Sequence, residues 1–130
     1  MSEIFNLEVI SPDRTFLNTE VNQVTIPAFE GLMTILKDHI NLVTFLRPGF
    51  IVVEKTNGVE NFYVEEGTVE FSNNNLLILS STVKNLKEIS KENVIKMIDD
   101  AKKNITNDEI NDKEKYQLSY KIDTLENINQ

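Results

Sequence analysis

The sequence predicts an α+β protein, in which an antiparallel β-sandwich (residues 1–88) is followed by an antiparallel helical hairpin (residues 89–130). Two observations support this prediction. Up to about residue 88, short apolar runs alternate with turn-forming residues and no helical period separates them, which is typical of a sandwich or barrel. After Leu86 the apolar residues recur every three or four positions, which is the period of a helix.

Four apolar runs in the first half are predicted to be strands. The first, residues 4–10, ends at a cluster of turn-forming residues, Ser11-Pro12-Asp13. The second contains Val21, Val24 and Ile26 and is expected to stop at Pro27. The remaining two are residues 32–36 and residues 42–46, the latter ended by Pro48-Gly49.

Two hairpins are expected to follow. Asn57-Gly58 suits a two-residue type I′ turn, because both residues tolerate a positive φ. That turn would pair Lys55 with Glu60, Val53 with Phe62, and Ile51 with Val64. The second hairpin would join residues 69–71 to residues 76–79 through the turn Asn73-Asn74-Asn75.

The helical region has two amphipathic stripes. Ser90 is the expected N-cap of the first helix, and Thr106-Asn107-Asp108 offers a break and a new cap. The first stripe consists of Val94, Ile98, Ala101 and Ile105, and the second of Ile110, Leu118, Ile122 and Leu125. Two short helices with a short connection indicate a hairpin in which these stripes pack together.

Composition excludes several classes of function. The 130 residues carry a net charge of −8, which argues against sequence-independent binding of nucleic acid and against adsorption to anionic lipid. A basic protein partner would suit this charge. The chain has no cysteine, and neither a secretion signal nor an apolar run long enough to span a membrane is visible. We therefore expect a cytoplasmic protein.

Motifs for catalysis and cofactor binding are missing. The four glycines are isolated from one another, so no phosphate-binding loop is expected. His39 is the only histidine and cannot build a multi-histidine metal site, and no nucleophile motif is present. We expect no catalytic residue, no cofactor and no metal.

One ordered set of motifs does point to a family. It comprises Phe5-x-Leu7-x-Val9-x-Ser11-Pro12, Glu30-Gly31, Ile35-Leu36, His39, Leu42-x-Thr44-x-Leu46-x-Pro48-Gly49, and residues 64–70. This set resembles the epsilon subunit of bacterial F-type ATP synthases, the equivalent of the mitochondrial delta subunit, and it spans nearly the whole chain. The resemblance implies a non-catalytic rotor subunit of the central stalk, peripheral on the cytoplasmic face of the inner membrane.

The resemblance also implies partners and a contact site. The partners would be the gamma subunit, the c-ring and, transiently, the catalytic-head subunits. Glu30, Gly31, Leu32 and His39 correspond to the edge that faces the c-ring. Leu32 stands where some relatives have an acidic residue, Lys37-Asp38 replaces the usual Pro-Gly, and Glu66 replaces a glycine. These departures put an acidic contact at position 32, and the usual shape of the loop before His39, in doubt.

Two regulatory properties of some relatives are not expected here. The relatives that bind ATP have an acidic residue and an arginine in the segment that here reads Ile89-Ser90-Lys91-Glu92-Asn93-Val94, so we predict no ATP binding at physiological concentration. In others the hairpin opens and its basic second helix blocks hydrolysis. Residues 106–130 are acidic overall, so we expect this hairpin to stay folded and to inhibit weakly.

Two other hypotheses remain open at this stage. A sugar-binding or ligand-binding sandwich would present exposed aromatic residues, but the chain has no tryptophan, and Phe5, Phe62 and Phe71 fit core positions. An enzyme using His39 would need a nearby carboxylate, for which the sequence offers no identifiable partner. Retrieval of gamma from membranes would separate both from the rotor hypothesis.

Overall fold

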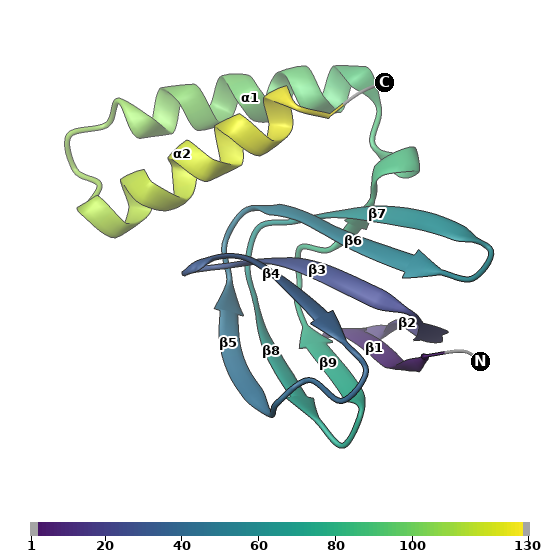
Figure 1. Ribbon diagram of the computed structural model, residues 1–130. Helices are drawn as coiled ribbons and strands as arrows, with labels where there is room; N and C mark the ends of the chain where they lie inside the picture. The colour runs from purple at the N-terminus through teal and green to yellow at the C-terminus, as the bar shows by residue number, and fades with distance from the viewer. Residues whose placement is uncertain (1–2, 129–130) are drawn as a thin grey trace.

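The computed structural model describes residues 3–128 and shows a strand-rich domain with two helices lying across one end (Figure 1). Ten strands precede the helices, and a short 3₁₀ turn connects the two parts. The elements are β1 (Phe5–Ser11), β2 (Arg14–Val21), β3 (Gln23–Ala28), β4 (Gly31–Leu36), β5 (Leu42–Leu46), β6 (Gly49–Lys55), β7 (Gly58–Val64), β8 (Gly67–Ser72), β9 (Asn75–Leu79), β10 (Lys84–Asn85), η1 (Leu86–Glu88), α1 (Lys91–Ile105) and α2 (Asp112–Glu126). The predicted sandwich with a C-terminal helical pair is confirmed.

The strands form one hydrogen-bonded path that folds over on itself into two layers. The order along this path is β10-β7-β6-β3-β5-β8-β9-β1-β2, and β4 pairs with β3 beside it. The two layers meet at a corner where β3 and β5 share a single pair, Ala28 with Leu46. Most neighbouring strands are antiparallel, but β1 pairs with β9 in parallel.

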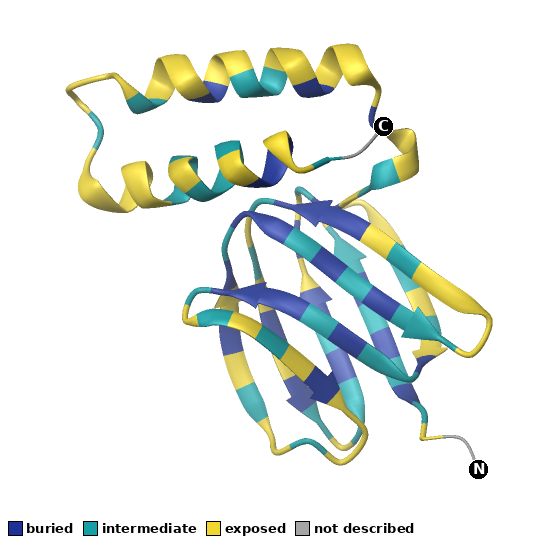
Figure 2. Cartoon of the chain, turned by 45° about the horizontal axis from the view of Figure 1, so that its top comes forward, coloured by how far each residue is buried: buried dark blue, intermediate teal, exposed yellow. Residues whose placement is uncertain are grey.

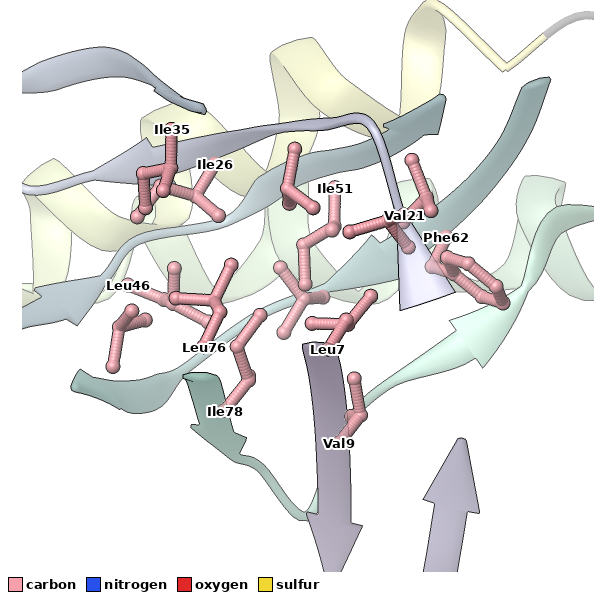
Figure 3. Packing of buried hydrophobic residues seen from close by; sticks show 14 of the residues in the cluster. Leu7, Val9, Val21, Ile26, Ile35, Leu46, Ile51, Phe62, Leu76 and Ile78 are labelled. Atoms are coloured by element: carbon pink, nitrogen blue, oxygen red, sulfur yellow. The ribbon is translucent and has the colours of Figure 1, made fainter. Parts of the chain in front are cut away.

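The hydrophobic core lies between the layers. Figure 3 shows side chains from both layers converging there, among them Leu7 and Val9 of β1, Ile26 of β3 and Leu76 and Ile78 of β9. Along most strands, buried residues alternate with intermediate or exposed ones because successive side chains point to opposite faces (Figure 2). Phe5 and Phe71 meet edge to face in this core, and Phe62 is also buried there, as the sequence predicted.

The first predicted turn differs from the structure in its register. The chain reverses over Thr56 and Asn57, so that Lys55 pairs with Gly58, Val53 with Glu60, and Ile51 with Phe62. The predicted pairs are therefore wrong by two residues. A type I′ turn needs positive φ at both central residues. The central residues here, Thr56 and Asn57, do not have one, and the positive φ of 147° belongs to Gly58, which follows them. A shift of two keeps each side chain on its face, and Lys55 still forms an ion pair with Glu60 at 2.7 Å.

The type I′ geometry occurs instead in the second hairpin. Asn73 and Asn74 have φ of 51° and 56°, and Ser72 pairs with Asn75 across them. Asparagine tolerates this left-handed conformation better than most residues. The predicted hairpin between β8 and β9 is thus confirmed, with Asn75 already in the strand.

Pro27 lies inside β3 and does not end it, contrary to the prediction. Its carbonyl oxygen accepts a hydrogen bond from the Arg47 backbone N–H at 2.9 Å, on the side away from β4. A proline is accommodated because this position needs no donor toward β4. The sequence prediction also did not separate β2 from β3, which turn at Asn22.

The helices begin and end close to the expected residues. Ser90 is the N-cap of α1, its Oγ accepting from the Asn93 N–H at 3.1 Å, as predicted. The chain breaks after Ile105, also as predicted. The cap of α2 lies outside the predicted Thr106-Asn107-Asp108 segment: it is Asn111, whose side chain accepts from the Glu114 N–H at 2.8 Å. Ile110 consequently lies in the connection and not on the second helix.

Candidate functional site

The residues predicted to face the c-ring are not part of one loop. Glu30 and Gly31 lie at the turn between β3 and β4, whereas His39 follows the turn after β4. Ala28 pairs with Gly31 at one end of this hairpin and Gln23 with Leu36 at the other. The six residues of β4 separate the two ends by about 20 Å, at roughly 3.3 Å per residue. Glu30 and His39 therefore cannot act on one small group.

The β3–β4 turn depends on a glycine and is fixed by a buried threonine. Gly31 has a φ of 138°, which side-chain-bearing residues rarely adopt. The carboxylate of Glu30 accepts from the hydroxyl of Thr44 on β5, with Oγ1···Oε2 at 3.2 Å. Glu30 itself is exposed, so its carboxylate is positioned at the surface by this contact.

The turn after β4 is tied to the hairpin tip of β8 and β9. The Asp38 N–H donates to the Asn74 side chain at 2.7 Å, and the Asn74 amide donates to the Asp38 carboxylate at 2.9 Å. Asp38 has a φ of 65°, the left-handed conformation that glycine adopts easily. The His39 ring packs edge to face on Phe71, with ring centroids 6.0 Å apart, and Nδ1 lies 2.8 Å from the Ile40 carbonyl oxygen.

Leu32, the remaining predicted residue, has a different character. Its side chain is 73% exposed on β4, and Leu36 on the same strand is 51% exposed. The face of β4 between them carries the exposed Thr34, whose hydroxyl meets that of Thr25 at 3.1 Å. The β4 stretch of the predicted contact edge is therefore largely apolar, between the exposed charges of Glu30 and Asp38.

The helical hairpin contacts the end of the sandwich that carries the β3–β4 turn, through polar and aromatic groups. The Arg47 guanidinium lies over the ring of Tyr120, 3.8 Å from its centroid. The Tyr116 hydroxyl donates to the carbonyl of Phe29 at 3.0 Å, and the rings of these two residues meet edge to face. Lys121 forms an ion pair with Glu65 at 3.3 Å.

A second apolar cluster lies beneath the helices around Tyr63. Leu125 of α2, Val94 of α1 and Ile89 belong to one cluster with this tyrosine, which is fully buried. The Tyr63 hydroxyl donates to the Glu65 carboxylate at 2.9 Å. Burial and the neighbouring Glu65 charge raise the pKa of Tyr63 far above its ordinary value. Tyr63 therefore stays neutral and in place across the physiological range.

Sequence reasoning missed this interface between the sandwich and the helices. Tyr116 and Tyr120 share one face of α2 at a spacing of four residues, but their partners come from other segments and no local spacing connects them to Arg47 or Glu65. An open cleft of about 810 Å³ remains beside them, between the start of α2 and the adjacent ends of β1, β5, β8 and β9. The hairpin thus rests on a limited set of contacts.

Neither a metal site nor a membrane-spanning helix is apparent in residues 3–128. No three His, Cys, Asp or Glu side chains within this range come together in a way that could hold a metal ion. Neither helix of this range has the length and apolar character needed to cross a bilayer.

Comparison with known proteins decides the family. Residues 4–85 match the family model described as "ATP synthase, Delta/Epsilon chain, beta-sandwich domain". The chain belongs to this family. An ATP synthase epsilon chain of Pelagibacter ubique is 45% identical over 130 residues, covering 99% of this chain and 100% of the relative. Another, from Allorhizobium ampelinum, is 30% identical over 98% of this chain and 91% of its own length. The predicted family is confirmed.

Solved structures show the same fold. A chain of the Euglena gracilis mitochondrial ATP synthase, in a structure of OSCP, F1 and the c-ring, superposes with a TM-score of 0.76 at 22% identity. That match covers 97% of this chain and 79% of the other. A chain from the central stalk and c-ring of the Tetrahymena thermophila enzyme gives a TM-score of 0.65 at 17% identity, covering 93% and 92%. At these identities the likeness establishes the fold of the family.

Proposed function

We propose that the chain is a non-catalytic rotor subunit in the central stalk of a bacterial F-type ATP synthase, where it links the gamma subunit to the c-ring. The observation that carries this proposal is the 45% identity to an ATP synthase epsilon chain, which extends along the full length of both proteins. The same helices follow the same sandwich in chains of solved ATP synthases. The chain would be peripheral on the cytoplasmic face of the inner membrane and would meet the catalytic-head subunits transiently.

We assign different roles to the two parts. Residues 1–88 would bind the stalk, and residues 89–130 would form an appendage that can act on hydrolysis. Within the first part, Glu30, Gly31, Leu32 and His39 are proposed as positions at or near the contact with the c-ring. Their placement favours two separate contacts, one at the β3–β4 turn and one at the turn after β4, joined by the exposed leucines between them.

A structural role is favoured over an enzymatic one by the surroundings of His39. A general base needs a substrate-facing nitrogen and a partner that orients the ring. Nδ1 of His39 lies against the Ile40 carbonyl, and the nearby Asp38 is engaged by Asn74. Glu30 lies at the far end of β4. These positions support a role in shaping the surface.

Affinity purification from native membranes tests the proposal. The full-length chain, tagged at one terminus and expressed in place of the untagged copy, should retrieve gamma, the c subunit and the catalytic-head subunits in fixed ratio. A matched control is the tagged chain added to membranes after solubilisation, which reports non-specific capture. Recovery of the chain without gamma would contradict the rotor assignment.

A further inference from the structure

Three strands of the described sandwich pair with a single neighbour, and β5 pairs with β3 only at Leu46. Among the described residues, β10, β2 and β4 each pair with a single neighbour. β10 is two residues long, and β2 carries Arg14 and Glu20. Short length and charge are the usual devices that prevent an edge from pairing with another chain. β4, with the sequence Gly-Leu-Met-Thr-Ile-Leu, has six residues without a charge or a proline.

The backbone of β4 presents hydrogen-bonding groups to this open side. Pro27 has no N–H, and its carbonyl is directed to Arg47 on the side opposite β4. Leu32 pairs with Pro27, so the backbone N–H and carbonyl of Leu32 also point away from the β3–β4 ladder, toward the open side of β4. Because these groups alternate along an antiparallel strand, Thr34 and Leu36 share this orientation. The Leu36 carbonyl accepts from the His39 N–H at 3.1 Å, so the open stretch is centred on Leu32 and Thr34.

The side chains beside this open backbone would complement an apolar strand. Leu32 and Leu36 are 73% and 51% exposed, and Thr34 lies exposed between them. Ile35 is buried in the core and anchors the strand from its inner face. Extended partners that add to a sheet edge obtain affinity from backbone hydrogen bonds and specificity from alternate side chains. β4 offers both kinds of contact.

We propose that β4 is a docking edge, to which an extended, uncharged aliphatic segment of a neighbouring stalk chain adds as a further strand. The inference rests on the proposed function, since it states how the edge around Leu32 makes its contact. Aliphatic contact with Leu32 replaces an acidic interaction at this position. A second copy of this chain is a poorer occupant, because two chains with a charge of −8 each repel one another.

Two substitutions at Thr34 separate backbone pairing from side-chain contact. Thr34→Pro removes the outward N–H, and a proline at such an edge position is compatible with the fold, as Pro27 is in β3. Thr34→Val retains the N–H and nearly the same shape, and is the matched control. Thr34→Pro should reduce retrieval of gamma and the c subunit by about tenfold, the effect of losing a backbone contact of roughly 1.4 kcal/mol. Thr34→Val should retrieve them as the unsubstituted chain does.

A second pair of variants guards against misfolding of Thr34→Pro. Leu32→Lys places a charge on the proposed edge, and Val59→Lys places one at a comparably exposed apolar position, 57% exposed, on β7. Leu32→Lys should weaken retrieval and Val59→Lys should not. Equal retrieval by both would show that β4 is not the docking edge.

Hydrogen exchange then tests strand addition directly. In the purified complex, the amides of Leu32 and Thr34 should exchange at least about tenfold more slowly than in the isolated chain. Unchanged exchange in a complex that contains gamma overturns this inference and leaves the rotor assignment standing. Failure to retrieve gamma at all overturns both. Protection that appears in the isolated chain together with a dimer mass would assign the edge to a second copy and refute the partner named here.

Discussion

The sandwich and the helical hairpin are stabilised in different ways. The sandwich buries a continuous core in which residues such as Leu7, Ile26 and Leu76 are fully inaccessible. Of the two helices, α1 buries only Val94 and Ala101, and α2 only Thr124 and Leu125 (Figure 2). Isolated helices of 15 residues are marginal in water, so these helices depend on the surface beneath them. The core of the sandwich stabilises the sandwich itself, whereas the helical hairpin is stabilised in part by packing on Tyr63 and Arg47 of the sandwich.

The largest expected effect is in the sandwich. Leu7→Ala removes a fully buried side chain from the core and should lower the free energy of unfolding by about 2–5 kcal/mol. Chemical denaturation monitored by circular dichroism measures the loss. Leu32→Ala, at an exposed position, is the control and should cost much less. Equal losses for the two variants would show that the core is not packed as described.

Leu125→Ala should affect the hairpin and spare the sandwich. Leu125 is 1% exposed and contacts the Tyr63 cluster, so its truncation should cost about 2–5 kcal/mol of docking free energy. Hydrogen exchange in α1 and α2 should accelerate, while exchange in β1 and β9 stays slow. If all regions accelerate together, the two parts unfold as one unit and the comparison above fails.

Tyr63 makes the lower surface of the hairpin sensitive to alkali. Its pKa in the folded chain is raised above the ordinary value of 10.0, so unfolding above that pH releases a proton. The raised pKa of Tyr63 makes its full contribution to the free energy of unfolding below about pH 10, and this contribution falls by about 1.4 kcal/mol per pH unit above it. Tyr63→Phe should remove this part of the decline between pH 10 and 11.5, at the cost of the hydrogen bond to Glu65. Parallel stability curves for the two proteins would disprove the assignment.

The contact between Arg47 and Tyr120 should contribute less. A cation over an aromatic ring contributes about 0.5–2 kcal/mol, depending on how far it is removed from water. A double-mutant cycle with Arg47→Gln and Tyr120→Leu, read from exchange in α2, should give a coupling of about 1 kcal/mol. A coupling near zero would mean that the two side chains are neighbours without a mutual contribution.

The smallest expected effect is on catalysis by the complex. Deleting residues 89–130 should change the rate of ATP hydrolysis by less than about twofold, because residues 106–130 are acidic overall and lack the basic character with which the second helix of some relatives blocks hydrolysis. The assay compares complexes carrying the full chain with complexes carrying residues 1–88. A rise of several-fold on deletion would establish the hairpin as an inhibitor and would refute the prediction made from its charge.

Local patterns predicted the elements well and their relationships less well. Ser90 caps a helix through its own side chain and a neighbouring N–H, so the sequence alone was sufficient there. At Asn57-Gly58 the same kind of reasoning chose the wrong register, because two turn geometries compete and the β6–β7 pairing selects one. Pro27 was predicted to end the strand because proline lacks an N–H. Whether that N–H is needed depends on the neighbouring strands β4 and β5, which the local sequence does not show.

The candidate site was predictable only in part. Glu30 and Gly31 lie at the start of β4, and His39 follows the turn after its end. Their separation results from the extended conformation of β4, which the resemblance did not specify. The exposure of Leu32 could have been expected, because an odd number of positions separates it from Ile35 on the same strand, so that the two side chains point to opposite faces and Ile35 points into the core. The contacts of Arg47 with Tyr120 and of Lys121 with Glu65 join residues more than fifty positions apart. Such pairs depend on the tertiary fold and leave no periodic signal.

The parallel pairing of β1 with β9 also constrains how the chain is made. β1 can form its hairpin with β2 as soon as both strands have emerged from the ribosome, but its other neighbour ends at Leu79. At a synthesis rate of about 5–20 residues per second, β1 waits on the order of ten seconds for this partner. During that interval Phe5, Leu7 and Val9 lack the cover that β8 and β9 later provide. β1 is thus translated before the other strands of the sandwich and is among the last to be enclosed, so its apolar face is exposed to aggregation during synthesis.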